Sequence, residues 1–201
     1  MTILIIKIVN NNHVQQFSFN AIQLVNRCQP SSYDFTKLRL IFFTAAIPAL
    51  NAFAGIDSVY ISLSELLVFL NRLDPHKDAH SRIIIFKINF LRIVQHEITH
   101  VILRDLANDI NISTPEVLNK NNIILSIKES GILAEKEHFG GRINWLESSF
   151  IQNLNIGYCE EHLNKIEAGQ YEKFDIKKAY VYQYSSDAQT MALLDMSDIE
   201  T

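Results

Sequence analysis

The sequence predicts an α+β fold in which a small N-terminal mixed sheet precedes a long helix and a second, shorter helix. Short β-branched and aromatic runs bounded by turn residues occupy the first third of the chain and suit strands. From Ile85 to Leu106 apolar residues recur at helical spacing. A second helical pattern covers 123–139 and ends at two glycines. We expect one domain over residues 1–184 and a polar tail over 185–201.

Composition limits the classes of protein to which the chain can belong. Its 201 residues suit one domain, and the 48% that are hydrophobic can form a substantial core. The net charge of −4 and the absence of lysine or arginine runs argue against nucleic-acid and membrane partners. Cys28 and Cys159 do not make a disulfide framework, so we expect reduced, buried or incidental thiols. We also expect a monomer.

We expect neither a membrane span nor a cleaved leader in this sequence. The longest apolar stretch, 38–56, contains Arg39, Pro48 and Asn51 and suits a protein core. The first residues lack a basic region and a small-residue cleavage site. We therefore expect a soluble protein that stays in a reducing compartment or is exported without a cleaved signal.

The elements predicted ahead of the long helix are short. They are a buried strand at 3–9, its hairpin partner at 14–19, a short helix at 21–27, and strands at 38–43 and 58–62. Residues 48–55 remain open between helix and loop. Ser62 and Glu65 form a capping-box pattern that opens a helix through Leu73.

The long helix, predicted over 81–108, contains His96-Glu97-Ile98-Thr99-His100. With about 3.6 residues per turn, His96 and His100 stand one turn apart on the same face. Two imidazoles so placed can bind one zinc ion, and Glu97 lies beside them, where it can reach a zinc-bound water. An alternative is a solvated face of an ordinary amphipathic helix. The apolar surroundings favour the metal site, because inward-facing histidines and a carboxylate need a partner.

Catalytic zinc sites use three protein ligands, and the second helix offers the third. Glu129 has Leu125, Ile132 and Leu133 among its helical neighbours, so we expect it to point inward. Glu135 is the alternative ligand. Whichever carboxylate does not bind the metal could orient a histidine ligand.

The expected chemistry is hydrolysis. Zinc held by His96, His100 and Glu129 would activate a water, and Glu97 would accept its proton as general base and pass it to the leaving amine. The donor for the oxyanion stays open. The candidates are Tyr180, Tyr182, Tyr184, His138 and His162.

His96-Glu97-Ile98-Thr99-His100 followed by Glu129-Ser130-Gly131 resembles the gluzincin branch of the zincin metallopeptidases. Leu103 and Leu106 stand where metzincins have a glycine and a third histidine. Leu133 stands where thermolysin-like enzymes have an aspartate. The resemblance implies a zincin-like fold with an active-site helix, and a strand at the cleft rim that pairs with substrate. Val59, Tyr60 and Ile61 are the candidates for that strand, with an interior strand as the alternative.

The size of the chain, its isoleucine- and asparagine-rich composition and the lack of a cleaved signal also resemble injected effectors of intracellular bacteria. One such family is a zinc metallopeptidase that cuts host actin. That resemblance implies a protein substrate such as actin, a bacterial cytoplasmic protein before export, and action in the host cytosol.

Two other functions stay open. One is a non-catalytic binding or regulatory module that keeps a zincin fold, and the other is a metal-dependent hydrolase of a non-peptide substrate. The presence of Glu97 favours catalysis, because a module that needed only the metal could dispense with the base.

Overall fold

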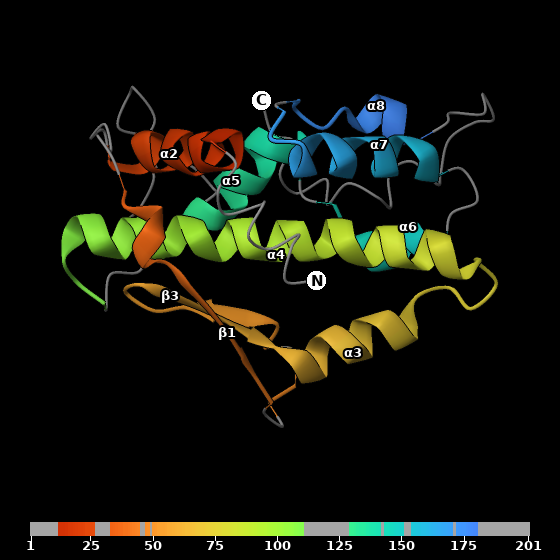
Figure 1. The fold of residues 1–201 in the computed structure, drawn as a ribbon, viewed down its shortest axis with the longest axis horizontal. Helices are drawn as coiled ribbons and strands as arrows, with labels where there is room; N and C mark the ends of the chain where they lie inside the picture. The colour runs from red at the N-terminus through yellow and green to blue at the C-terminus, as the bar shows by residue number, and fades with distance from the viewer. Residues whose placement is uncertain are drawn as a thin grey trace.

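The protein is an α+β structure built around one long helix, α4 (Ala79–Ala107). A computed structural model describes residues 12–26, 33–44, 47–48, 50–110, 129–141, 143–150, 154–170 and 172–180. Figure 1 shows a small sheet and α3 on one side of α4, and α2, α5 and α7 on the other. The α+β class and the small mixed sheet predicted from the sequence are confirmed.

The sheet has three strands in the order β1-β3-β2. β1 (Arg39–Phe43) pairs in parallel with β3 (Ser58–Ser62), and β2 (Ala52–Ala54) pairs with β3 in antiparallel. Val59 and Ile61 are fully buried in the core, whereas Tyr60 between them points to the opposite face. The strands predicted at 38–43 and 58–62 are therefore confirmed. The stretch at 48–55 was left open between helix and loop, but its residues Ala52–Ala54 form strand β2, which neither alternative predicts.

Local signals set the bounds of α3 (Leu63–Arg72) and α4. The Ser62 hydroxyl accepts a hydrogen bond from the Glu65 N–H, as the capping pattern predicts. Asp78 caps α4 in the same way, and α4 then runs unbroken for 29 residues to Ala107, where the C-cap Asn108 has a left-handed φ of 50°. Within the residues that the structure describes, no helix is long and apolar enough to cross a membrane.

The hairpin strand predicted at 14–19 is wrong, because these residues lie in helix α2 (Asn12–Asn26). Val14, Phe17 and Ala21 are buried at helical spacing on one side of α2. The Thr99 hydroxyl of α4 donates to the hydroxyl of Ser18, at 2.9 Å, across the same interface. The strand predicted at 3–9 lies outside the described residues.

The remaining helices are shorter. They are η1 (Phe35–Lys37, a 3₁₀ turn), α5 (Ser130–Phe139), α6 (Trp145–Ser149), α7 (Ile156–Glu167) and α8 (Ile176–Ala179). α5 ends where the sequence predicts, at Gly140, which has a left-handed φ of 74°. The first part of the predicted second helix, 123–128, and the tail 185–201 lie outside the described residues.

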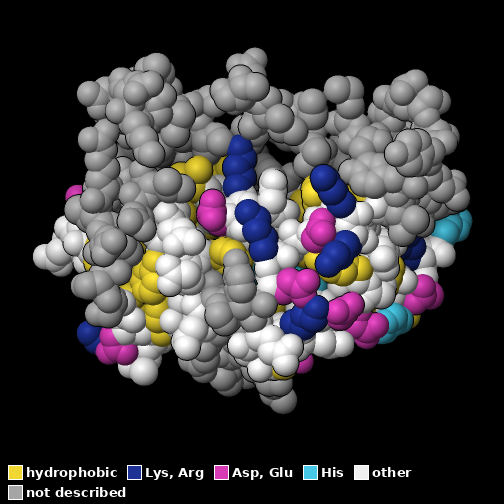
Figure 2. Space-filling view, turned by 90° about the horizontal axis from the view of Figure 1, so that it is seen from above, with side chains coloured by type: hydrophobic (Ala, Val, Ile, Leu, Met, Phe, Trp, Pro, Cys, Tyr) yellow, Lys and Arg dark blue, Asp and Glu magenta, His cyan; other side chains and the backbone are white. Residues whose placement is uncertain are grey.

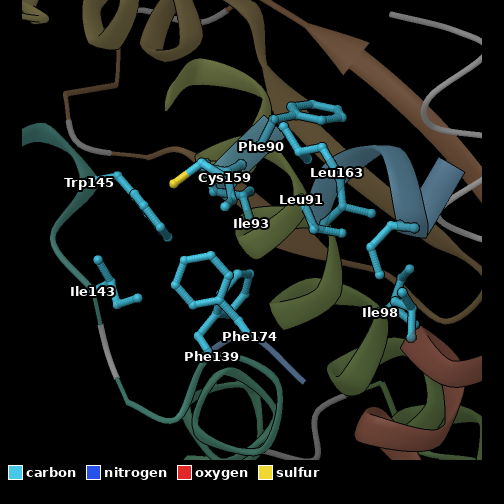
Figure 3. Close-up of a cluster of buried hydrophobic side chains, with 14 of the residues drawn as sticks. Phe90, Leu91, Ile93, Ile98, Phe139, Ile143, Trp145, Cys159, Leu163 and Phe174 are labelled. Atoms are coloured by element: carbon cyan, nitrogen blue, oxygen red, sulfur yellow. The ribbon is translucent and has the colours of Figure 1, made fainter. Parts of the chain in front are cut away.

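Aromatic side chains fill the core where α5, α6 and α7 meet α4. Figure 3 shows Phe139, Trp145 and Phe174 facing one another, with Trp145 edge-on to the other two rings. Cys159 of α7 is a free, buried thiol whose pKa is raised by burial to about 12. At that pKa it stays protonated near neutral pH, and a thiol is a poor nucleophile.

The face of the molecule on which α2 and α7 lie carries charges of both signs. Figure 2 shows Lys and Arg side chains next to Asp and Glu side chains across the described part of this face. Lys165 contacts both Glu161 and Glu172, and these contacts raise its pKa. The described charges on this face therefore neutralise one another locally rather than forming a region of single sign.

A buried histidine pair joins α5 and α7, which lie on the same side of α4. The Nε2 atoms of His138 and His162 lie 3.0 Å apart. Gln95 of α4 donates its amide N–H to the Ala134 carbonyl, so its amide oxygen accepts from His138 Nδ1. With Nδ1 protonated, a neutral His138 accepts at Nε2, and His162 donates to it.

Burial lowers the pKa of His162 to about 4 and lowers that of His138 well below its ordinary value. Because these folded-state pKa values lie below the unfolded value of about 6.5, the stabilisation is complete above that pH. We expect the free energy of unfolding to fall as the pH drops from about 6.5 towards 4, by at most about 1.4 kcal/mol per pH unit for each histidine.

The measurement is urea unfolding between pH 4 and 8 for the wild type and for His162→Gln. Glutamine keeps an N–H donor for His138 but does not titrate, so the slope against pH should shrink by about one proton. Equal slopes in the two proteins would show that His162 does not titrate as its burial requires.

Candidate metal centre

Three predicted ligands come together where α5 begins beside the middle of α4. His96 and His100 lie one turn apart on α4, and Glu129 directly precedes α5. Their ligand atoms all lie within 4.8 Å of one another. His96 Nε2 is 3.3 Å from Glu129 Oε2, and His100 Nε2 contacts Glu129 Oε1. The described residues thus contain a two-histidine, one-carboxylate cluster.

Glu129 reaches this position as the N-cap of α5 and not as a residue within a helix. Its two carboxylate oxygens accept from the backbone N–H groups of Gly131 and Ile132, each at 3.0 Å. The sequence predicted that Glu129 would point inward from within a helix, but it lies at the N-cap of α5. A carboxylate has about four lone-pair sites, so these cap bonds leave acceptor capacity facing the histidines.

Glu135, the alternative ligand, lies behind His96. Its Oε1 accepts from His96 Nδ1 at 2.8 Å and from Arg92 Nη1 at 2.9 Å, and its side chain is buried. A carboxylate at Nδ1 fixes the proton there, so the neutral ring presents its Nε2 lone pair towards Glu129. Glu135 thus has the orienting position that the sequence analysis left to the non-ligating carboxylate.

Gly131 lets α5 approach α4 at the His96 ring. A Cβ atom built on Gly131 would lie 2.6 Å from three atoms of that ring. The ring is held from the other side by Glu135, so it has little room to move. The glycine is therefore required by the close contact between the two helices.

The electrostatics of the cluster favour an ionised Glu129 beside a protonatable Glu97. Burial opposes ionisation of Glu129, but its contacts with His100 and His96 outweigh this and lower its pKa to about 2. Burial raises the pKa of Glu97, while the charges of His96, His100 and Arg104 act in the opposite direction. Glu97 is therefore within electrostatic range of the cluster and is suited to exchange a proton.

The donor set fits a zinc ion. Two imidazole nitrogens and one carboxylate oxygen are typical of catalytic zinc, and the tautomer of His96 directs a lone pair to the shared space. The side chains of His96, His100 and Glu129 are 23%, 17% and 30% exposed, so the cluster is open on one side. An open side is what distinguishes a catalytic from a closed structural site.

β3 does not offer the substrate-binding edge predicted for Val59, Tyr60 and Ile61. It is the central strand, and its backbone is paired with β1 on one side and β2 on the other. Pairing with a substrate would require one of those occupied edges. This part of the prediction is wrong, and the interior-strand alternative describes β3 correctly.

The described oxyanion candidates are engaged elsewhere. His138 and His162 are buried against each other. The Tyr180 hydroxyl is buried and within 2.9 Å of the Ser148 hydroxyl. Tyr182 and Tyr184 lie outside the described residues.

Two arginines near the cluster were not identified from the sequence. Arg92 lies four residues before His96 and contacts Glu135, while Arg104 lies four residues after His100 and donates to the Ala54 carbonyl of β2. Both arginines are spaced four residues from a histidine on α4, so helical spacing could have predicted that they lie near the cluster.

Gly131→Ala tests the contact between α4 and α5. The added methyl should force the helices apart and lower the free energy of unfolding by about 1–3 kcal/mol. Gly157→Ala in α7 is the matched control, because its Cβ would meet only Asn155 Oδ1, at an ordinary 3.5 Å. Thermal unfolding of both variants measures the difference, and a Gly131→Ala protein as stable as wild type would contradict the close approach.

Comparison of the chain with protein-family models, with characterised proteins and with solved structures gives no match.

Proposed function

We propose that the protein is a zinc-dependent endopeptidase with a zincin-like, gluzincin-type site. The observation that carries the proposal is the open cluster of His96, His100 and Glu129 with Glu97 beside it. A helix bearing both histidines and the base, with the third ligand from a second helix, is the zincin arrangement. The resemblance to an actin-cleaving effector family extends the proposal to a protein substrate such as actin in the host cytosol.

Each residue of the cluster has a distinct task. A bound zinc ion would supply Lewis-acid polarisation and a water of lowered pKa. Glu97 would take up a proton from the attacking water and return it to the leaving amine, a role that suits its raised pKa. His96, His100 and Glu129 would hold the ion, while Glu135 keeps the proton of His96 on Nδ1.

Arg92 supports this arrangement from further away. It donates to the same Glu135 oxygen as His96 and, through Nε, to Asn89 Oδ1 at 3.2 Å. A buried carboxylate without a cationic partner would tend to become protonated. Arg92 therefore keeps Glu135 an acceptor for His96.

Zinc content measured by elemental analysis tests the site. We expect about one zinc per chain in the wild type and in Glu97→Gln, and its loss in His100→Ala and Glu129→Ala. Glu135→Ala should keep the site but weaken zinc affinity about 10–100-fold, as loss of an orienting carboxylate does. A wild type that takes up no zinc, even after the metal is added back, would sink the proposal.

Cleavage of a panel of folded proteins, including actin, tests the chemistry. Zinc-loaded wild type should produce new chain ends that mass spectrometry detects, whereas Glu97→Gln should produce none while retaining zinc. Equal behaviour of the two proteins in every assay would favour the non-catalytic module instead. Hydrolysis of small amides or esters without any protein cleavage would favour a hydrolase of non-peptide substrates.

A further inference from the structure

We propose that Arg104 is a substrate-recognition residue, and that the polypeptide cut at the metal centre carries an aspartate or glutamate whose carboxylate binds Arg104. This proposal rests on the proposed function and names the charge that its substrate carries near the bond that is cut.

The middle of α4 is open to solvent along one narrow strip. Over residues 88–103, the residues of the helix that are not buried are Arg92, His96, Glu97 and His100. The half-buried Arg104 continues this strip one turn beyond His100. A substrate at the metal centre can contact this part of α4 only along the strip, and Arg104 lies at one end of it.

Helix geometry places Arg104 close to the bond that would be cut. With a rise of about 1.5 Å per residue it lies about 6 Å beyond His100 along the axis, and it is within about 20° of Glu97 around the axis. Its charge opposes the effect of burial on the pKa of Glu97, which agrees with this placement. Because an extended chain advances about 3.3 Å per residue, Arg104 should meet a side chain about two or three residues from the cut bond.

The guanidinium group of Arg104 is held in place and still has a donor to offer. Nη1 donates to the Ala54 carbonyl of β2, and Nε is buried without a hydrogen-bond partner in the described part of the chain. Nη2 is neither buried nor hydrogen-bonded to any described residue, so it can bind a ligand. Because the side chain is already fixed by Ala54, binding costs little further loss of rotamer freedom.

Arg104 also lacks an ion pair among the residues that the structure describes. At the other end of the strip Arg92 is neutralised by Glu135, whereas the group that Arg104 contacts is the uncharged Ala54 carbonyl. An acidic side chain of the substrate would supply the missing charge, and a carboxylate bound to a guanidinium forms one of the stronger hydrogen bonds in proteins.

A carboxylate suits this position better than a phosphate group. The strip also carries Glu97, and Glu129 lies across from its histidines. The larger negative charge of a phosphate would be repelled more strongly by both of them than the single charge of a carboxylate.

A purely structural role for Arg104 predicts a different behaviour. If Arg104 only ties α4 to β2 through the Ala54 carbonyl, its removal would weaken the binding of every peptide alike. Recognition of a carboxylate instead predicts a loss confined to peptides that carry the acidic residue, which a double-mutant cycle measures.

The test measures binding, so it does not depend on turnover. Zinc-loaded Glu97→Gln protein is panned against phage-displayed random peptides, and the tightest binder is labelled for fluorescence anisotropy. We expect the enriched peptides to share an aspartate or glutamate at one fixed position. A synthetic analogue with asparagine or glutamine at that position should bind with a Kd about tenfold higher or more, because a hydrogen bond between charged groups is lost.

In the same background, Arg104→Gln should raise the Kd of the acidic peptide by the same factor and leave that of its amide analogue unchanged. Lys87→Gln is the matched control, because it removes one positive charge from α4 about 180° around the helix from His96. It should leave both Kd values unchanged. Thermal unfolding and zinc content check that each variant is folded, and Arg104→Met is a second neutral variant should Arg104→Gln fail to fold.

Three results would overturn the proposal. They are the absence of enriched peptides or of a shared acidic position, an equal loss of affinity for the acidic and amide peptides when Arg104 is neutralised, and a preference for the acidic peptide that survives that change. Failure of the zinc or cleavage experiments while Arg104 still selects acidic peptides would instead count against the peptidase.

Discussion

The close contact between α5 and α4 is the constraint on which the site depends. Gly131 permits the approach, since any side chain there would enter the His96 ring. The approach places Glu129 across from both histidines and Glu135 behind one of them. Gln95 adds a second link, because its amide donates to the Ala134 carbonyl and accepts from His138. The face of α5 that packs against α4 thus positions Glu129 and Glu135 against the histidines, and through Glu135 it sets the protonation of His96.

The sheet packs against α4 on the side away from α5. Its inner face, with Val59 and Ile61, packs in the core, and Arg104 fixes the end of β2 to the histidine-bearing side of the helix. The face opposite to α4 keeps its aromatic rings partly exposed. The sheet thus has a packed inner face and an apolar, partly exposed outer face.

Parts of this structure with strong local signals were predictable from the sequence. Ser62 predicts the start of α3, and the helical spacing of apolar residues around His96 predicts α4. Both signals come from residues that are close together in the sequence. The residues at 14–19 were misread as a strand, because their burial in α2 depends on packing against α4 and α5. β2 could not be recognised either, since three residues form a strand only through their partner β3.

The same distinction applies to the site. His96, Glu97 and His100 were identifiable because the helix brings them together by itself. The sequence predicted Glu129 as a ligand from its helical neighbours, but the residue lies at the N-cap of α5. The order of the strands leaves β3 without a free edge, and that order depends on contacts between distant segments. The arginines that support the cluster lie at helical spacing from the histidines, but their partners, Glu135 and Ala54, come from distant segments.

The double use of Glu129 has a thermodynamic consequence. Because the same carboxylate starts α5 and faces His96 and His100, the formation of that helix and the occupancy of the cluster are reciprocally linked. A cation that prefers this arrangement would stabilise the folded state by an amount that grows with the logarithm of its concentration. Conversely, any substitution that frays the first turn of α5 would lower the apparent affinity for the ion without touching a ligand.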